Sequence, residues 1–167
     1  MNKLKVYDLC LVALLAGIEY VIFNSFSNIL YLELITFTIC LFALSFSKEM
    51  AILASILFGS IMLIFNGINF WNIMYIFIYP SYSLIVALLK KYLLKYEWLL
   101  CLICGFLSFL TGQLLQLPFM LFSQKLTILY LIMGLKTSLL QGAISFIACK
   151  VLFKPCYNTL RKLRGTR

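Results

Sequence analysis

Six long apolar segments, separated by short polar connections, restrict most strongly how this chain can fold. In lipid, every backbone polar group needs a partner within the protein, and a helix supplies it. At about 1.5 Å of rise per residue, most of the segments reach or nearly reach the ~30 Å of a hydrocarbon core. The sequence therefore predicts an all-α integral membrane protein, a compact bundle of six transmembrane helices. The predicted spans are Val6–Phe26, Leu30–Phe46, Met50–Phe65, Ile73–Leu89, Trp98–Leu121 and Thr127–Phe153.

Composition excludes an ordinary soluble domain. Of the 167 residues, 64% are hydrophobic and 11% are charged, and the mean hydropathy is +1.06. In water such a chain would expose far more apolar surface than a soluble monomer tolerates. Because the polar connections are too short to hold a catalytic module, we expect residues 1–167 to form a single transmembrane domain.

The Lys and Arg residues are distributed very unevenly among the connections. If the N-terminus is cytoplasmic, 12 of the 14 lie on the inner side. These are Lys3, Lys5, Lys48, Lys90, Lys91, Lys95, Lys150, Lys154, Arg161, Lys162, Arg164 and Arg167. Lys125 alone lies outside, and Lys136 falls within the sixth segment. The positive-inside rule then predicts a multi-pass membrane protein with both termini in the cytoplasm.

The basic C-terminal end, from about residue 154 to 167, is expected to be a cytoplasmic tail beside anionic lipid. A nucleic-acid partner is not expected. The partner of this tail is therefore the lipid bilayer.

Residues suited to catalysis are few. The chain has no His, no glycine-rich phosphate loop and no pair of carboxylates at helical spacing. Cys101 and Cys104 form a C-x-x-C pattern, but no second pair accompanies it, and small apolar residues in a helix are the favoured interpretation. We therefore expect no catalytic residue, no metal and no cofactor, and the protein is not expected to be an enzyme.

Charged residues within the apolar segments indicate a candidate site. By helical rise, Glu19 lies roughly 20 Å from the inner side and Lys136 roughly 14 Å from the outer side. Two interpretations are open: the two residues neutralise each other as an ion pair, or Lys136 offers a cation to an anionic or strongly polar ligand, with Glu19 as its charge partner. Glu33, near the outer end of the second segment, is interpreted as interfacial.

Further polar and aromatic side chains are predicted at the same depth. Gln113 and Gln116 share a face of the fifth segment at i, i+3 spacing and need hydrogen-bond partners there. Trp71, Asn72 and Tyr75 follow an Asn-rich connection, although Trp71 is equally typical of an interfacial aromatic belt. This distribution favours a pocket open to the outside over a continuous polar pore. The predicted ligand-binding residues are Lys136, Gln113, Gln116, Trp71, Asn72 and Tyr75.

Taken together, these residues resemble the substrate-binding S components of energy-coupling factor (ECF) transporters, which import vitamins and related micronutrients into bacteria. Ala13-x-x-x-Gly17 is a small-xxx-small pattern that allows close helix approach, and it is similar to the surface with which S components dock on their T component. Phe42–Ala54, followed by Phe58-Gly59, is similar to the family's helix-turn-helix between spans two and three. Ser138–Gly142 and Leu152–Pro155 are similar to the pattern of its last helix.

The resemblance implies that the chain binds a vitamin-like small molecule in an outward-facing pocket and delivers it by docking on a transmembrane T component, powered by two separate cytoplasmic ATPases. It implies docking roles for Ala13, Ala16 and Gly17, and a location in the bacterial cytoplasmic membrane. Two alternatives remain: a non-transporting MreD-like membrane scaffold, whose buried charges would be structural, and a small ion-coupled secondary carrier with Glu19 and Lys136 as relay groups. The small size and the lack of an inverted repeat disfavour the carrier.

Overall fold

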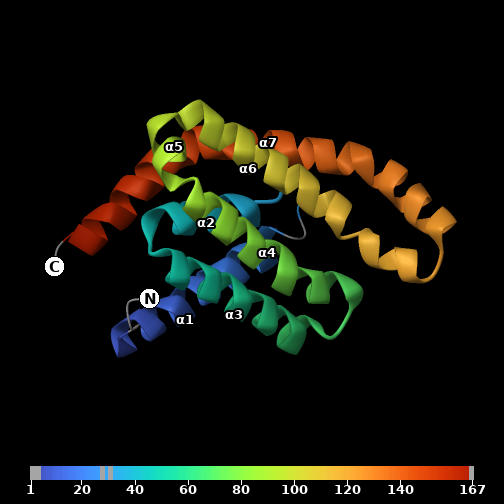
Figure 1. Ribbon diagram of the computed structural model, residues 1–167, viewed down its shortest axis with the longest axis horizontal. Coiled ribbons are helices and arrows are strands. Elements are labelled where there is room, and N and C mark those ends of the chain that lie inside the picture. Colours follow the sequence, from blue (N-terminus) through green and yellow to red (C-terminus); the bar gives the residue numbers. More distant parts are fainter. Residues whose placement is uncertain (1–4, 27–28, 30–31, 166–167) are drawn as a thin grey trace.

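The computed structural model describes residues 5–26, 29 and 32–165, with side chains up to residue 162, and this part of the chain is helical without a β-strand. In chain order the elements are α1 (Val6–Phe26), α2 (Ile35–Ser45), α3 (Lys48–Asn66), α4 (Phe70–Leu88), α5 (Lys90–Lys95), α6 (Glu97–Leu114), the 3₁₀ turn η1 (Leu117–Leu121) and α7 (Gln124–Gly165) (Figure 1).

Five helical segments of the described chain are long and apolar enough to cross a membrane. They are Val6–Phe26, Lys48–Asn66, Phe70–Leu88, Glu97–Leu121 and Gln124–Lys162. Their outward surfaces carry large apolar side chains, among them Leu14, Phe77 and Ile132, which suit contact with lipid. The prediction of an all-α, multi-pass membrane protein is confirmed.

The second predicted span, Leu30–Phe46, differs from the other five. Its helix, α2, has 11 residues and is therefore about 16 Å long, roughly half the thickness of a hydrocarbon core. All of its residues are buried, and α2 contacts α1, α3, α4, α5, α6 and α7. Five of the six predicted spans thus correspond to helices long enough to cross a membrane, and the second corresponds to a shorter apolar helix (Leu30 itself lies outside the described residues). Instead of facing lipid, α2 is the centre of the bundle.

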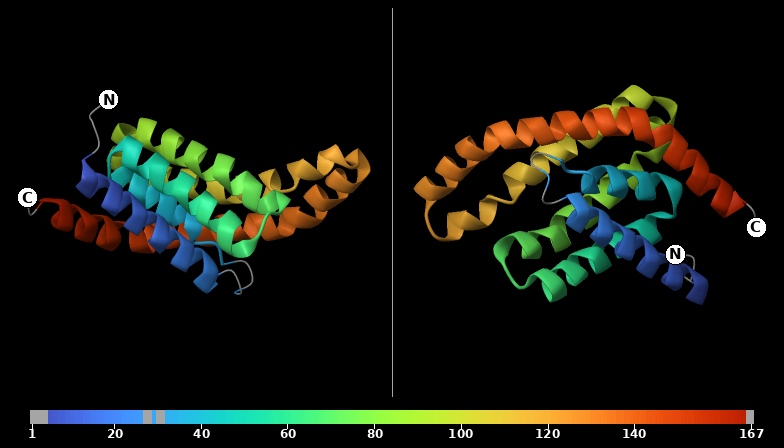
Figure 2. Two further views of the ribbon diagram at one scale, coloured as in Figure 1. Left: turned by 90° about the horizontal axis from the view of Figure 1, so that it is seen from below. Right: turned by 180° about the vertical axis from the view of Figure 1, so that it is seen from behind.

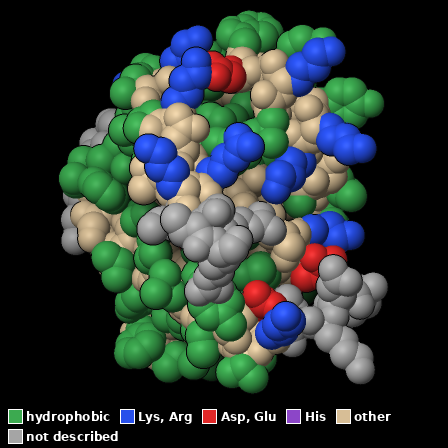
Figure 3. All heavy atoms as spheres, turned by 90° about the vertical axis from the view of Figure 1, so that its left-hand side faces the viewer, with side chains coloured by type: hydrophobic (Ala, Val, Ile, Leu, Met, Phe, Trp, Pro, Cys, Tyr) green, Lys and Arg blue, Asp and Glu red, His purple; other side chains and the backbone are tan. Residues whose placement is uncertain are grey.

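Both termini lie at one end of the bundle in all three ribbon views (Figures 1 and 2). The short helix α5 lies at the same end, and Lys and Arg side chains gather on this surface (Figure 3). Lys3 and Arg167 lie outside the described residues. The predicted tail is not a separate segment, because α7 continues as one helix of 42 residues to Gly165. Lys154 fastens this part of α7 to α6 through an exposed ion pair with Glu97, 3.0 Å long.

Glycines set the closest helix contacts. A Cβ atom placed on Gly142 of α7 would lie 2.8 Å from the carbonyl oxygen of Gly105 on α6. A Cβ on Gly59 of α3 would lie 2.9 Å from the Cα of Ile76 on α4. Small residues at such crossings let two backbones approach, which compensates for the absence of a hydrophobic driving force between helices in lipid. The bundle therefore consists of two close helix pairs, α3–α4 and α6–α7, with α1 and α2 packed beside them.

Candidate functional site

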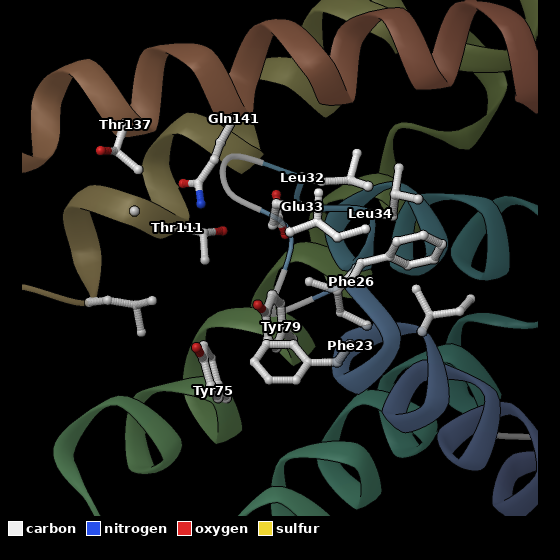
Figure 4. A pocket seen from close by; sticks show the side chains of 15 residues that line it. Phe23, Phe26, Leu32, Glu33, Leu34, Tyr75, Tyr79, Thr111, Thr137 and Gln141 are labelled. Carbon is white, nitrogen blue, oxygen red and sulfur yellow. The ribbon is translucent and has the colours of Figure 1, made fainter.

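A cavity of about 280 Å³ lies next to the beginning of α2. Its walls come from α1, from the connection between α1 and α2, and from α4, α6 and α7 (Figure 4). Apolar side chains such as Phe23 and Phe26 form much of the lining. The polar lining groups are Glu33, Tyr75, Tyr79, Thr111, Thr137 and Gln141. A partly polar cavity of this size suits a small organic molecule.

The cavity exists because α2 is short. The chain reaches Ile35 outside any helix, with Leu32, Glu33 and Leu34 in irregular backbone and Glu33 in contact with α6 and α7. Irregular backbone at membrane depth is tolerated only where it is buried in protein or lines a cavity. Interrupted helices mark the substrate sites of many transporters for the same reason.

The carboxylate of Glu33 is held by neutral donors. Its Oε1 accepts hydrogen bonds from the backbone N–H of Thr36 at 3.1 Å and from the Thr36 hydroxyl at 2.6 Å. Its Oε2 accepts a hydrogen bond from the hydroxyl of Ser108 on α6. Ser145 of α7 donates to the backbone carbonyl oxygen of Glu33 at 2.8 Å. These contacts join the beginning of α2 to the middle of α6 and α7 and fix the carboxylate at the cavity wall.

Two tyrosines of α4 form the opposite wall. Tyr75 and Tyr79 lie one helical turn apart, and their rings stack with centroids 5.2 Å apart and planes inclined by 17°. Phe23 of α1 contacts the Tyr75 ring edge-on at 5.5 Å, and Tyr82 contacts the Tyr79 ring edge-on at 6.3 Å. The stack is therefore held from both sides and presents rigid aromatic surface together with phenol groups.

Amide and hydroxyl groups complete the lining from α6 and α7. Figure 4 shows the Gln141 amide and the Thr111 and Thr137 side chains turned toward the space in front of Glu33 and the tyrosines. Thr111 donates to the carbonyl oxygen of Leu107 at 3.0 Å. Within the described part of the chain, the Gln141 amide makes no hydrogen bond. It is thus available to a ligand.

One of the six predicted ligand-binding residues, Tyr75, is among the residues that line this cavity. Gln113 uses its amide to donate to the Ser138 hydroxyl at 2.8 Å, which ties α6 to α7. Gln116 is half-buried just beyond the end of α6. The structure therefore places both glutamines outside the cavity lining.

The two residues predicted near the α3–α4 connection have other contacts. Trp71 is 46% exposed and packs against Phe119 of η1, as an interfacial aromatic residue would. Asn72 is buried and donates from Nδ2 to the Gly67 carbonyl oxygen at 2.8 Å, while its backbone N–H is capped by the side chain of Asn69. Asn72 therefore holds the connection in shape.

The ion pair between Glu19 and Lys136, one of the two interpretations left open by the sequence, is not formed. Glu19 is fully buried in α1, and its two carboxylate oxygens have no hydrogen-bond partner among the described residues. Lys136 is exposed on α7, whereas its neighbour Thr137 lines the cavity. Counting along a helix gave similar depths for the two charges but not the direction in which each side chain points.

The docking residues predicted on α1 differ in exposure. Ala13 is exposed, and a Cβ on Gly17 would meet no atom within 4 Å. Ala16 is fully buried inside the bundle. Ala13 and Gly17 therefore lie on an open face and Ala16 does not, and the docking roles stay a prediction.

Five polar residues of the cavity lining were missed: Glu33, Tyr79, Thr111, Thr137 and Gln141. Tyr75, Tyr79 and Tyr82 recur at i, i+4 and i+7, which was a readable signal for one shared helix face. Glu33 was assigned to the membrane interface because a full-length second helix would have put it there.

A comparison with protein-family models, with curated proteins and with solved structures found no match for this chain. The fold and the cavity alone define it as a multi-pass helical membrane protein with a partly polar cavity beside α2.

Proposed function

We propose that this protein is the substrate-binding subunit of an ECF-type importer and that it binds a vitamin-like small molecule in the cavity beside α2. The observation that carries the proposal is the half-length helix α2, which begins at a cavity lined by Glu33, Tyr79 and Gln141. A purely structural bundle has no need to bring irregular backbone and polar groups together in the membrane, where both are costly.

We assign the end that carries both termini and α5 to the cytoplasm, because Lys and Arg side chains gather there. The cavity then lies in the outer half of the membrane, between α2 and the α3–α4 connection. A ligand would reach it from outside, as an importer requires.

Delivery would depend on other proteins. The described residues contain no group of three or more side chains that could hold a metal ion. We assign ATP hydrolysis to two separate cytoplasmic ATPases, as in other ECF importers. The open face of α1 around Ala13 and Gly17 is the proposed docking surface for a transmembrane T component. This subunit would release its ligand by reorienting against that partner.

The binding step can be tested with the gently purified full-length protein. After denaturation, mass spectrometry of the extract should detect a small molecule in stoichiometric amount. Gln141→Ala, which removes an amide from the cavity, should retain much less of it. Gln124→Ala, which removes an exposed amide at the start of the same helix, is the matched control and should retain it fully. If no small molecule is recovered and none stabilises the protein, the proposal is wrong.

A small ion-coupled carrier is the second candidate, because Glu19 is a buried carboxyl group without a hydrogen-bond partner in the described chain. A carrier transports its substrate in proteoliposomes that contain no ATPase, driven by an ion gradient alone. An S component does not. An MreD-like scaffold needs no cavity and would yield neither flux nor a bound small molecule.

A further inference from the structure

We infer that the cavity selects an organic cation, such as a protonated amine or a positively charged heterocycle, held between the Glu33 carboxylate and the stacked rings of Tyr75 and Tyr79. This inference rests on the proposed function and specifies its substrate class. It reverses the expectation from Lys136, which favoured an anionic ligand.

The first argument is the uncompensated charge of Glu33. Burial favours the neutral carboxyl group, whereas the hydrogen bonds from Thr36 and Ser108 and its place at the N-terminal end of α2 favour the ionised carboxylate. A cation bound beside it would add to the second effect. The hydrogen-bond donors are all neutral. Among the described residues no Lys or Arg nitrogen lies within 4.0 Å of Glu33, since the salt bridge in this part of the chain is Lys154–Glu97. A ligand cation would supply the missing counter-charge.

The second argument is the aromatic wall. The face of an aromatic ring carries negative potential and attracts a cation, most strongly where water is excluded. Tyr75 and Tyr79 are buried and nearly parallel, and both line the same cavity as Glu33. A planar cation could therefore contact ring surface and carboxylate at the same time.

The third argument comes from what a different ligand would meet. An anion in this cavity would lie close to Glu33 in surroundings of low dielectric, where repulsion between like charges is strong. Lys136 cannot offset that repulsion from its exposed position on α7. A neutral ligand would satisfy Gln141 and the hydroxyl groups but would leave the carboxylate without a counter-ion.

Three probes of similar size and different charge test the inference: benzylammonium, benzyl alcohol and benzoate. Their dissociation constants are measured by ligand-observed NMR on the full-length protein in nanodiscs, after extensive washing. Benzylammonium should bind at least about tenfold more tightly than the other two, which corresponds to 1.4 kcal/mol. Glu33→Gln should abolish this preference. Glu97→Gln, which removes a surface carboxylate, should preserve it.

A second pair of variants covers the case in which Glu33→Gln does not fold. Tyr75→Phe keeps an aromatic face and should retain the preference for benzylammonium, whereas Tyr75→Leu should weaken it.

Equal binding of the three probes, a preference for benzoate, or an unchanged preference in Glu33→Gln would overturn the inference and leave the proposed function standing. If no probe binds and no small molecule is recovered from the native protein, both are overturned.

Discussion

The contact between α6 and α7 at Gly105 and Gly142 gives a quantitative test of the fold. A Cβ on Gly142 would lie 2.8 Å from the Gly105 carbonyl oxygen and 3.2 Å from the Cβ of Phe109. A Cβ on Gly105 would meet the Gly142 carbonyl oxygen at 2.8 Å. Because the obstructing atoms belong to the backbone, no change of side-chain rotamer relieves the clash. The two helices must move apart.

The expected effect follows from two opposing contributions. Overpacking a well-packed interior costs about 1–3 kcal/mol. Replacing a glycine by alanine within a helix returns roughly 0.5–1 kcal/mol. The difference between the middle values of these ranges is about 1 kcal/mol, and we therefore expect Gly142→Ala to lower the free energy of unfolding by that order. Gly134→Ala on the same helix is the matched control, because its new Cβ would lie 3.9 Å from the nearest side-chain atom, Nε2 of Gln113.

The assay is reversible unfolding in mixed micelles by titration with SDS, followed by circular dichroism. The midpoint of Gly142→Ala should fall below that of the wild type, while the midpoint of Gly134→Ala should equal or exceed it. Gly105→Ala combined with Gly142→Ala should cost less than the sum of the single variants, since one helix displacement relieves both clashes. Equal midpoints for Gly142→Ala and Gly134→Ala would refute the close α6–α7 contact.

Two further substitutions test roles that were assigned from the sequence. Lys136→Met should leave ligand affinity unchanged within about twofold, because the side chain is exposed outside the cavity lining. Calorimetry measures the affinity, and a loss of tenfold or more would show that Lys136 belongs to the binding site. Ala13→Leu together with Gly17→Leu should preserve folding and ligand binding and abolish co-purification with a T component. Ala16→Leu should instead destabilise the fold, because Ala16 is fully buried. An intact complex in the double variant would exclude this face of α1 as the docking surface.

The sequence predicted the membrane-crossing helices well, since hydropathy reports directly on transfer into lipid. The prediction for the first span coincides with α1, and the third span differs from α3 by a few residues. Hydropathy gave a wrong length and position for the second predicted span, which contains α2. An apolar segment buried inside protein and one that faces lipid have the same composition, so hydropathy could not show that Ile35–Ser45 lies at the centre of the bundle.

The site was predicted only in part, for a geometric reason. Counting residues gives the depth of a side chain along a helix, but successive residues point about 100° apart. Lys136 is therefore exposed, while Thr137 beside it lines the cavity. Glu33 was misplaced because its position depended on the conformation of the chain before α2. The short α2 moves it from the expected membrane surface to contacts with Ser108 and Ser145.

Glu19 is the buried group that ligand binding leaves unexplained. Its side chain is fully buried in α1, and both carboxylate oxygens are without a hydrogen-bond partner in the described part of the chain. A buried polar group in this condition costs about 1–3 kcal/mol of stability. Glu19→Met has a similar volume and no unsatisfied oxygen, so its free energy of unfolding should rise by an amount of that order. Glu19→Gln keeps an unsatisfied polar group and should resemble the wild type.

Uptake measurements on the same variants then separate packing from function. If the carboxyl group of Glu19 is only tolerated by the fold, Glu19→Met should be more stable and should import substrate as well as the wild type, with its T component and ATPases present. If the group carries a proton during transport, the more stable Glu19→Met protein should bind ligand and fail to import it. A loss of stability in Glu19→Met would contradict the reasoning, because it would mean that the carboxyl group has a stabilising partner in the membrane. The cost of keeping Glu19 is thus itself an argument that the protein uses it.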